Sequence, residues 1–254
     1  GAMTVVLLPV IARHGVDKVP LLAVMAGLML LVLAVAGLGR TVDLIPWPVV
    51  EGFTMGIGVI IFLQQFPLAL GTPKGESEST VVAAWETLLA TDWTKAWLPL
   101  LIVALVLVVH LALTPIKRNV PIALVAVIAG TLVAWALDLD VERIGALPTG
   151  LPLPSVPAVD FRMLTTLAAP ALAIAALAAL ESLLSARVAD SMVPTLPRTN
   201  PDRELFGQGI ANLGSGLFGG LPATGAIART AVNVRSGGRT RVAAIVHSIV
   251  LTAI

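Results

Sequence analysis

Long stretches without a charged residue constrain this chain more than any other feature. Residues 20–39 and 52–73 contain no Asp, Glu, Lys or Arg. A helix that crosses a bilayer needs about 20 mostly apolar residues, and inside lipid a helix satisfies its own backbone polar groups. Only 12% of the residues are charged and 57% are hydrophobic, whereas soluble domains carry about 25% charged residues. The sequence therefore predicts an all-α, polytopic membrane protein.

The chain divides into about nine apolar segments, two of which are short. They are residues 3–12, 20–39, 52–73, 96–116, 119–137, 163–186, 205–220, 221–234 and 242–254. The first and last of them run into the two ends of the chain. We therefore expect the sequence to be a piece of a longer protein, in which Gly1-Ala2-Met3 can also be a tag remnant.

The basic residues are distributed unevenly between the connecting loops. Sorting the loops alternately places nine Lys and Arg with four acids on one side, if residues 205–220 and 221–234 make separate passes. The other side has six basic residues and nine acids. Cytoplasmic loops are enriched in Lys and Arg, so the first side is predicted to be cytoplasmic and the protein to lie in the plasma (inner) membrane.

The segment LPATGAIARTAVN, residues 221–233, has the composition of a broken helix at a binding site. Pro222 ends the preceding apolar run, and Thr224 to Ala226 are small enough for a ligand to approach the backbone. A helix start offers unpaired N–H groups and the positive end of the helix dipole. Ile227 and Ala228 are the next residues of this predicted helix start and are expected to belong to the same site. The segment therefore predicts an anion site, and close packing of small residues is the alternative.

The beginning of the chain resembles this segment. Gly1 and Ala2 in GAMTVVLLPV stand where Gly225 and Ala226 stand in GAIARTAV. Inverted-repeat transporters place two such half-helices at the membrane midplane, with their N-termini toward one substrate. We therefore predict that Gly1 and Ala2 contribute to the same site.

Two ionisable residues lie within apolar segments. Arg229 follows the predicted half-helix start within about a turn, and Glu181 follows the uncharged run 171–180, with Ser185 one turn later. A charged side chain inside a membrane-spanning segment is energetically costly and usually has a function. Arg229 is predicted to have a functional partner, and a structural salt bridge, for example with Glu181, is the alternative. Glu181 and Ser185 are predicted to bind a coupling ion, or else Glu181 caps a neighbouring half-helix.

Catalytic and metal sites are not expected. The chain has no cysteine, and His14, His110 and His247 are isolated, without the spacing of metal ligands. No phosphate-binding loop or nucleophile motif is present. The sequence indicates neither an enzyme nor a cofactor, apart from a coupling proton or sodium ion.

Three motifs occur in order along the chain: IPWPVVEGFTMGIGVIIFLQQ, ESLLSARVAD and ELFGQGIANLGSGLFGGLPATGAIARTAVN. Together they closely resemble bacterial members of the SulP (sulfate permease) family, over essentially all 254 residues. The resemblance implies a uracil-permease-like fold of two inverted repeats with seven segments each. This chain is expected to begin at the third segment and to end in the eleventh.

The resemblance also implies a division of the transmembrane domain. Residues 1–40 and 163–254 are expected to form parts of a core, residues 45–137 part of a gate, and residues 138–162 an extracellular loop. The cytoplasmic STAS domain of the family is expected to be absent from this sequence.

The implied function is secondary active transport of sulfate, bicarbonate or a dicarboxylate by elevator-like alternating access. The resemblance implies that Arg229 lends positive potential to the anion site. It assigns proton or sodium coupling to Glu181, and implies that the hydroxyl of Ser185 completes a sodium site. A homodimer is expected for the full-length protein, and nucleic acid is not an expected partner. The alternatives are a nucleobase-type permease on the same fold, a membrane enzyme and a voltage-sensing motor.

Overall fold

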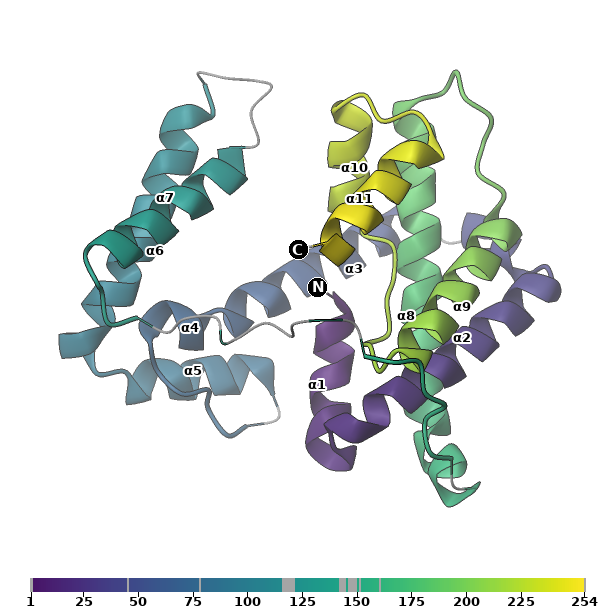
Figure 1. Ribbon diagram of the computed structural model, residues 1–254, viewed down its shortest axis with the longest axis horizontal. Coiled ribbons are helices and arrows are strands. Elements are labelled where there is room, and N and C mark those ends of the chain that lie inside the picture. The colour runs from purple at the N-terminus through teal and green to yellow at the C-terminus, as the bar shows by residue number, and fades with distance from the viewer. Residues whose placement is uncertain are drawn as a thin grey trace. The chain divides into compact units, whose positions relative to one another are not determined.

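Helices form all the regular structure in the described part of the chain, shown as a computed structural model in Figure 1. The structure describes residues 2–44, 46–77, 79–115, 122–141, 145, 150, 152–159 and 161–253. Its α-helices are α1 (Ala2–His14), α2 (Val19–Val35), α3 (Trp47–Gln64), α4 (Phe66–Leu70), α5 (Thr80–Ala90), α6 (Trp93–Leu113), α7 (Ile122–Ala136), α8 (Phe161–Met192), α9 (Pro201–Leu217), α10 (Ile227–Arg235) and α11 (Arg241–Ala253). Two 3₁₀ helices, η1 (Val16–Lys18) and η2 (Leu38–Leu44), flank α2.

Each predicted apolar segment overlaps a helix. Residues 221–234, predicted as an interrupted run with a half-helix start near Gly225, contain α10, which begins at Ile227. The predicted loop between the third and fourth segments contains α5, which the apolar pattern missed because the helix is short. One face of α5 is nevertheless buried, at Ala83, Ala84 and Thr87.

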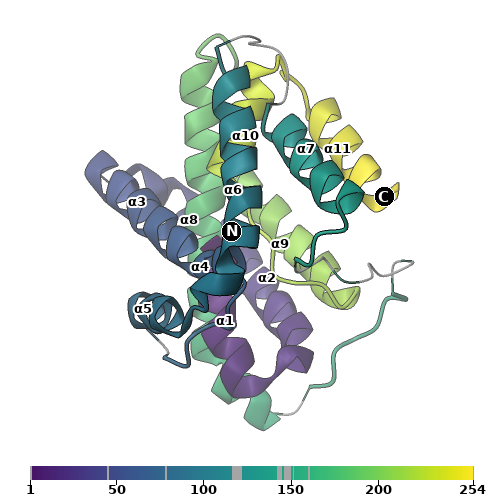
Figure 2. The same ribbon diagram turned by 90° about the vertical axis from the view of Figure 1, so that its left-hand side faces the viewer.

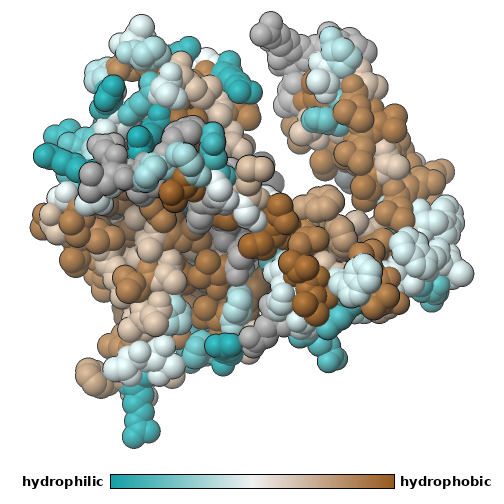
Figure 3. All heavy atoms as spheres, turned by 180° about the vertical axis from the view of Figure 1, so that it is seen from behind, coloured by the Kyte–Doolittle hydropathy of each residue, from teal (hydrophilic) through white to brown (hydrophobic). Residues whose placement is uncertain are grey.

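Three helical segments are long and apolar enough to cross a membrane, namely Val16–Val35, Trp93–Leu113 and Phe161–Met192. Large apolar side chains also cover much of the surface. Val32 is 67% exposed and Leu111 is 68% exposed. In Figure 3 the body on the left carries its apolar side chains in a band between polar ends. Water does not favour so much exposed apolar area, so lipid is its natural solvent.

Contacts divide the chain into two compact units. The first unit comprises Gly1–Thr54 and Gly150–Ile254, and the second comprises Met55–Thr149, so the boundary falls within α3. The assignment of residues 1–40 and 163–254 to a core, and of residues 45–137 to a gate, stays a prediction.

In the second unit α4 packs against both α5 and α6, and α6 packs against α7. Asp92 caps the start of α6, where its Oδ1 accepts bonds from Thr94 Oγ1 at 2.6 Å and Thr94 N at 3.0 Å. These hydrogen bonds lower the pKa of the exposed Asp92 carboxyl. The loop before α5 is tied to that helix by the bond from Gly75 N to Thr87 Oγ1, 3.1 Å long.

In the first unit α8 lies at the centre, where it contacts α1, α2, α9 and α10. Figures 1 and 2 show its long ribbon with α10 along its upper part. Its 32 residues extend to roughly 48 Å. This length lets one rigid helix position residues near the middle of the unit as well as a loop beyond its end.

Helices α2 and α9 cross at glycines. A Cβ built on Gly216 would lie 2.6 Å from the carbonyl oxygen of Pro20, and one on Gly27 would lie 2.9 Å from that of Gly209. Glycine lets helix backbones approach this closely, which is a common way to pack helices in lipid. The crossing therefore depends on the absence of side chains at these positions.

We expect Gly216→Ala to destabilise the protein because the new methyl group meets backbone of α2. Overpacking costs about 1–3 kcal/mol. Gly214→Ala on the same helix is the matched control, since its Cβ would meet nothing within 4 Å. Thermal unfolding in detergent should give a lower Tm for Gly216→Ala and an unchanged or slightly higher Tm for Gly214→Ala. Equal Tm values for the two variants would show that the crossing is not tightly packed.

Candidate functional site

The chain between α9 and α10 is not helical. Gly219 has φ +71°, a left-handed conformation that glycine adopts readily at a helix end. Gly220 N then donates to Ser215 O at 2.7 Å. Residues 220–226 at about 3.3 Å each and the nine residues of α10 at about 1.5 Å each together reach roughly 35 Å. This length suffices for a separate pass, as the charge-based orientation requires.

Asn212 of α9 holds the middle of this segment. Its Oδ1 accepts a bond from Ala223 N, and its Nδ2 donates to Ala223 O, both at 2.9 Å. Gln208, one turn earlier, also donates to Ala223 O. Asn212 is fully buried and Ala223 is exposed, and these bonds satisfy backbone groups of the non-helical segment that would be costly to leave unpaired in an apolar environment.

The far end of the segment is fixed to α8. Thr224 Oγ1 donates to Ala178 O at 3.1 Å. A Cβ built on Gly225 would lie only 3.1 Å from Ser182 Cα. Gly225 therefore has a packing role against α8, which was the alternative to its predicted role in admitting an anion. The structure is compatible with both roles.

The backbone N–H groups from Thr224 to Arg229 donate to no other residue that the structure describes. Ala226 is the N-cap of α10 with extended backbone (φ −132°, ψ 118°) and provides no side-chain cap. The first helical bond runs from Thr230 N to Ala226 O at 2.9 Å. Thr224 to Ile227 are half-buried. A row of unpaired donors at a helix start favours an anionic partner.

Helix α1 faces this helix start from the opposite side. Figures 1 and 2 both show α1 and α10 pointing away from each other, with their N-terminal ends directed toward the middle of the unit. Ala2 is the first residue of α1, and the predicted site residue Gly1 lies outside the described residues. This is the arrangement expected for two half-helices at one site, and the participation of Ala2 stays a prediction.

Arg229 lies in the first turn of α10 and is exposed. It borders a cavity of about 630 Å³ between α10 and α11 that is also lined by Gly225, Ala226, Ala228 and His247. No described residue forms an ion pair with Arg229. The salt bridge with Glu181 that the sequence left open is thus not formed, although the Arg229 charge acts on Glu181 through space.

The two predicted coupling residues lie on α8 beside α10. Ser185 is buried, and its hydroxyl is 2.6 Å from that of Thr230 in α10. Glu181 is half-buried. It is one turn from Ser185, and no described residue forms a hydrogen bond with its carboxylate. Glu181 therefore does not cap a neighbouring half-helix through such a bond. The binding of a coupling ion by this pair stays a prediction.

Sequence reasoning missed the polar face of α9. Glu204, Gln208 and Asn212 are four residues apart and so share one face of the helix. Ser182 of α8 donates to Glu204, whereas Gln208 and Asn212 hold Ala223. The four-residue spacing was the available signal, but only the fold shows that the partner is an unwound segment.

Comparisons with known proteins agree with the sequence-based resemblance. The family model described as "Sulfate permease family" matches residues 2–254. YvdB of Bacillus subtilis, provisionally named a sulfate transporter, is 36% identical over 99% of this chain and 48% of its own length. Bicarbonate transporter BicA of Synechocystis is 34% identical over 100% of this chain and 46% of its own length. The chain thus spans about half the length of these relatives.

Solved structures match as well. The transmembrane domain of a cyanobacterium bicarbonate transporter BicA has a TM-score of 0.83 and 32% identity, covering 100% of this chain and 66% of that one. Murine Slc26a9 has a TM-score of 0.73 at 18% identity, covering 95% and 40%, and supports the fold alone. These domains have the 7+7 inverted-repeat fold, so this chain holds part of that fold, and it is a multi-pass membrane protein with the expected plasma-membrane location. The chain belongs to the sulfate permease family.

Proposed function

We propose that the full-length protein is a secondary active transporter of a small inorganic or organic anion. The observation that carries this proposal is the row of N–H groups from Thr224 to Arg229, which donate to no other residue that the structure describes. Thr224 to Ile227 are half-buried, and an unpaired donor that is removed from water costs about 1–3 kcal/mol, which a bound anion would offset. The relatives are named as transporters of sulfate or bicarbonate, and we extend that class to this protein rather than a catalytic role.

The proposed site recognises charge through the backbone and through one guanidinium. Arg229 supplies a full positive charge, and the starts of α1 and α10 each add about half a charge. Backbone donors in this arrangement suit oxygen-rich anions, because each oxygen can accept a hydrogen bond. Sulfate, bicarbonate and small dicarboxylates all meet this requirement.

Coupling is proposed to use Glu181 and the hydroxyl pair of Ser185 and Thr230. A carboxylate can carry a proton, or it can ligate sodium together with hydroxyl oxygens. Transport is proposed to move the unit containing α8, α9 and α10 against the remainder of the full-length protein, in an elevator-like manner. The division into two contact units supports this mechanism. A homodimer is part of the same proposal.

The test is uptake by the full-length protein in proteoliposomes, with labelled sulfate, bicarbonate and fumarate under proton or sodium gradients. We expect Ala226→Leu to reduce uptake of the transported anion at least tenfold, because Ala226 lies among the N–H groups that are proposed to bind the anion. Gly225→Val is less informative, since it also presses on Ser182. Ala112→Leu, at an exposed position in α6, is the control. Normal uptake by folded Ala226→Leu would place the anion elsewhere.

Asn212→Ala should weaken transport by removing the partner of Ala223 N and one partner of Ala223 O. The lost bonds free the segment that carries the donors, so we expect a higher KM in addition to a lower Tm. Asn212→Asp keeps the acceptor for Ala223 N but sets a second carboxylate oxygen against Ala223 O in a buried position, so it should not restore activity. If Asn212→Ala lowers only the Tm and leaves KM unchanged, Asn212 stabilises the fold without positioning the site.

Glu181→Gln should abolish gradient-driven accumulation because a neutral amide neither releases a proton nor attracts sodium. Exchange of internal for external anion should persist, since it needs no net coupling. Ser185→Ala should weaken sodium dependence if sodium is the coupling ion, and should have little effect on proton-driven uptake. Uptake at several pH and sodium values distinguishes these cases. Accumulation by Glu181→Gln equal to that of the unmodified protein would refute the coupling role.

A further inference from the structure

A second electropositive hollow lies away from the proposed transport site. Figures 1 and 2 show the loop after α8 and the loop after α10 at the same end of the first unit. Between these loops and the start of α9 is a cavity of about 1160 Å³. Its lining includes four arginines, and we call it the four-arginine cavity: Arg198, Arg203, Arg239 and Arg241.

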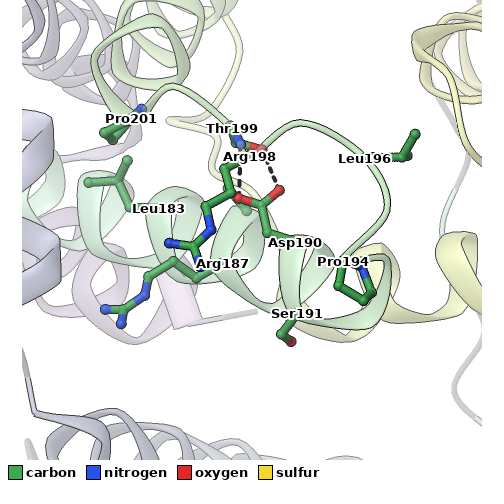
Figure 4. A pocket seen from close by; sticks show the side chains of 10 residues that line it. Leu183, Arg187, Asp190, Ser191, Pro194, Leu196, Arg198, Thr199 and Pro201 are labelled. Carbon is green, nitrogen blue, oxygen red and sulfur yellow. Dashed lines mark hydrogen bonds between the residues drawn. The ribbon is translucent and has the colours of Figure 1, made fainter.

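The carboxylates in this cavity are engaged by other groups. Asp190 accepts bonds from Thr199 N and Thr199 Oγ1, both at 2.9 Å. Figure 4 shows these two bonds, with the loop that carries Arg198 folded over the end of α8. Glu204 accepts a bond from Ser182. The acids are thus turned toward hydroxyl and backbone donors of the protein.

The four guanidinium groups, in contrast, are exposed and form no ion pair or hydrogen bond with a described residue. Like charges around one hollow repel each other, and a polyanion between them would relieve that repulsion. The first-turn N–H groups of α11, which begins at Arg241, add further donors at the same place.

We propose that the four-arginine cavity binds a phosphate group carrying two negative charges, either on a lipid headgroup or on a soluble molecule. Guanidinium groups suit phosphate because their planar donors can form paired hydrogen bonds. The predicted orientation puts the cavity on the cytoplasmic side, where basic pockets between helices bind anionic headgroups. The site is separate from Arg229 and Glu181 and does not depend on which anion is transported.

The test uses the purified full-length protein and native mass spectrometry with phosphatidic acid, phosphatidylcholine and free pyrophosphate as probes. We expect phosphatidic acid or pyrophosphate to bind, and phosphatidylcholine not to bind. The double variant Arg198→Gln/Arg239→Gln should weaken binding roughly 25-fold, at about fivefold per arginine. Preference for phosphatidic acid identifies a lipid site, and equal binding of pyrophosphate identifies a site for soluble phosphate.

Arg235→Gln is the matched control, since Arg235 is an exposed arginine at the end of α10 that does not line the cavity. It should bind the probes as the unmodified protein does. A Tm measurement checks that the double variant is folded, and the single variants replace it if it is not. The proposal is overturned if neither phosphate probe binds, or if the cavity variants and Arg235→Gln bind equally well.

Discussion

The need to satisfy backbone polar groups in an apolar environment governs the arrangement of the first unit. A helix does this for itself, but the chain between α9 and α10 leaves the helical conformation. Such a break is tolerated only where protein or a ligand supplies partners. Asn212 and Gln208 supply them at Ala223. The N–H groups from Thr224 to Arg229 donate to no other residue in the described part of the chain, and this difference within one short segment defines the candidate site.

The close crossing of α2 and α9 holds α9 in place on the side opposite its polar face. Gly27, Gly209 and Gly216 bring the two backbones together, while Asn212, between the last two, turns to the unwound segment. Polar contacts also fix the other end of α9. There Asp202 accepts a hydrogen bond from Gly39 N at 2.9 Å and forms an ion pair with Arg40 at 3.5 Å. Helix α9 is thereby fixed on one side and presents its polar face on the other.

The sequence predicted the helical segments because uncharged length is a direct consequence of crossing lipid. It also predicted a broken helix at residues 221–233 from Pro222 and Gly225. It missed α5, whose burial depends on tertiary contacts, and it did not identify what Asn212 holds. Nor could periodicity distinguish the packing of Gly225 on Ser182 from a role in admitting a ligand. Such partners are far apart in sequence, so only the folded chain brings them together.

The lack of an ion pair between Arg229 and Glu181 has a consequence for coupling in the proposed transporter. A direct ion pair would let each residue neutralise the other and would weaken the attraction for both substrate and coupling ion. Left apart, Arg229 can attract an anion while Glu181 attracts a proton or sodium ion. Each bound ion then reduces the repulsion that the other meets, so binding of one strengthens binding of the other by the same factor. We infer that this reciprocal effect, acting between α8 and α10, would link anion and cation movement without direct contact between the two residues.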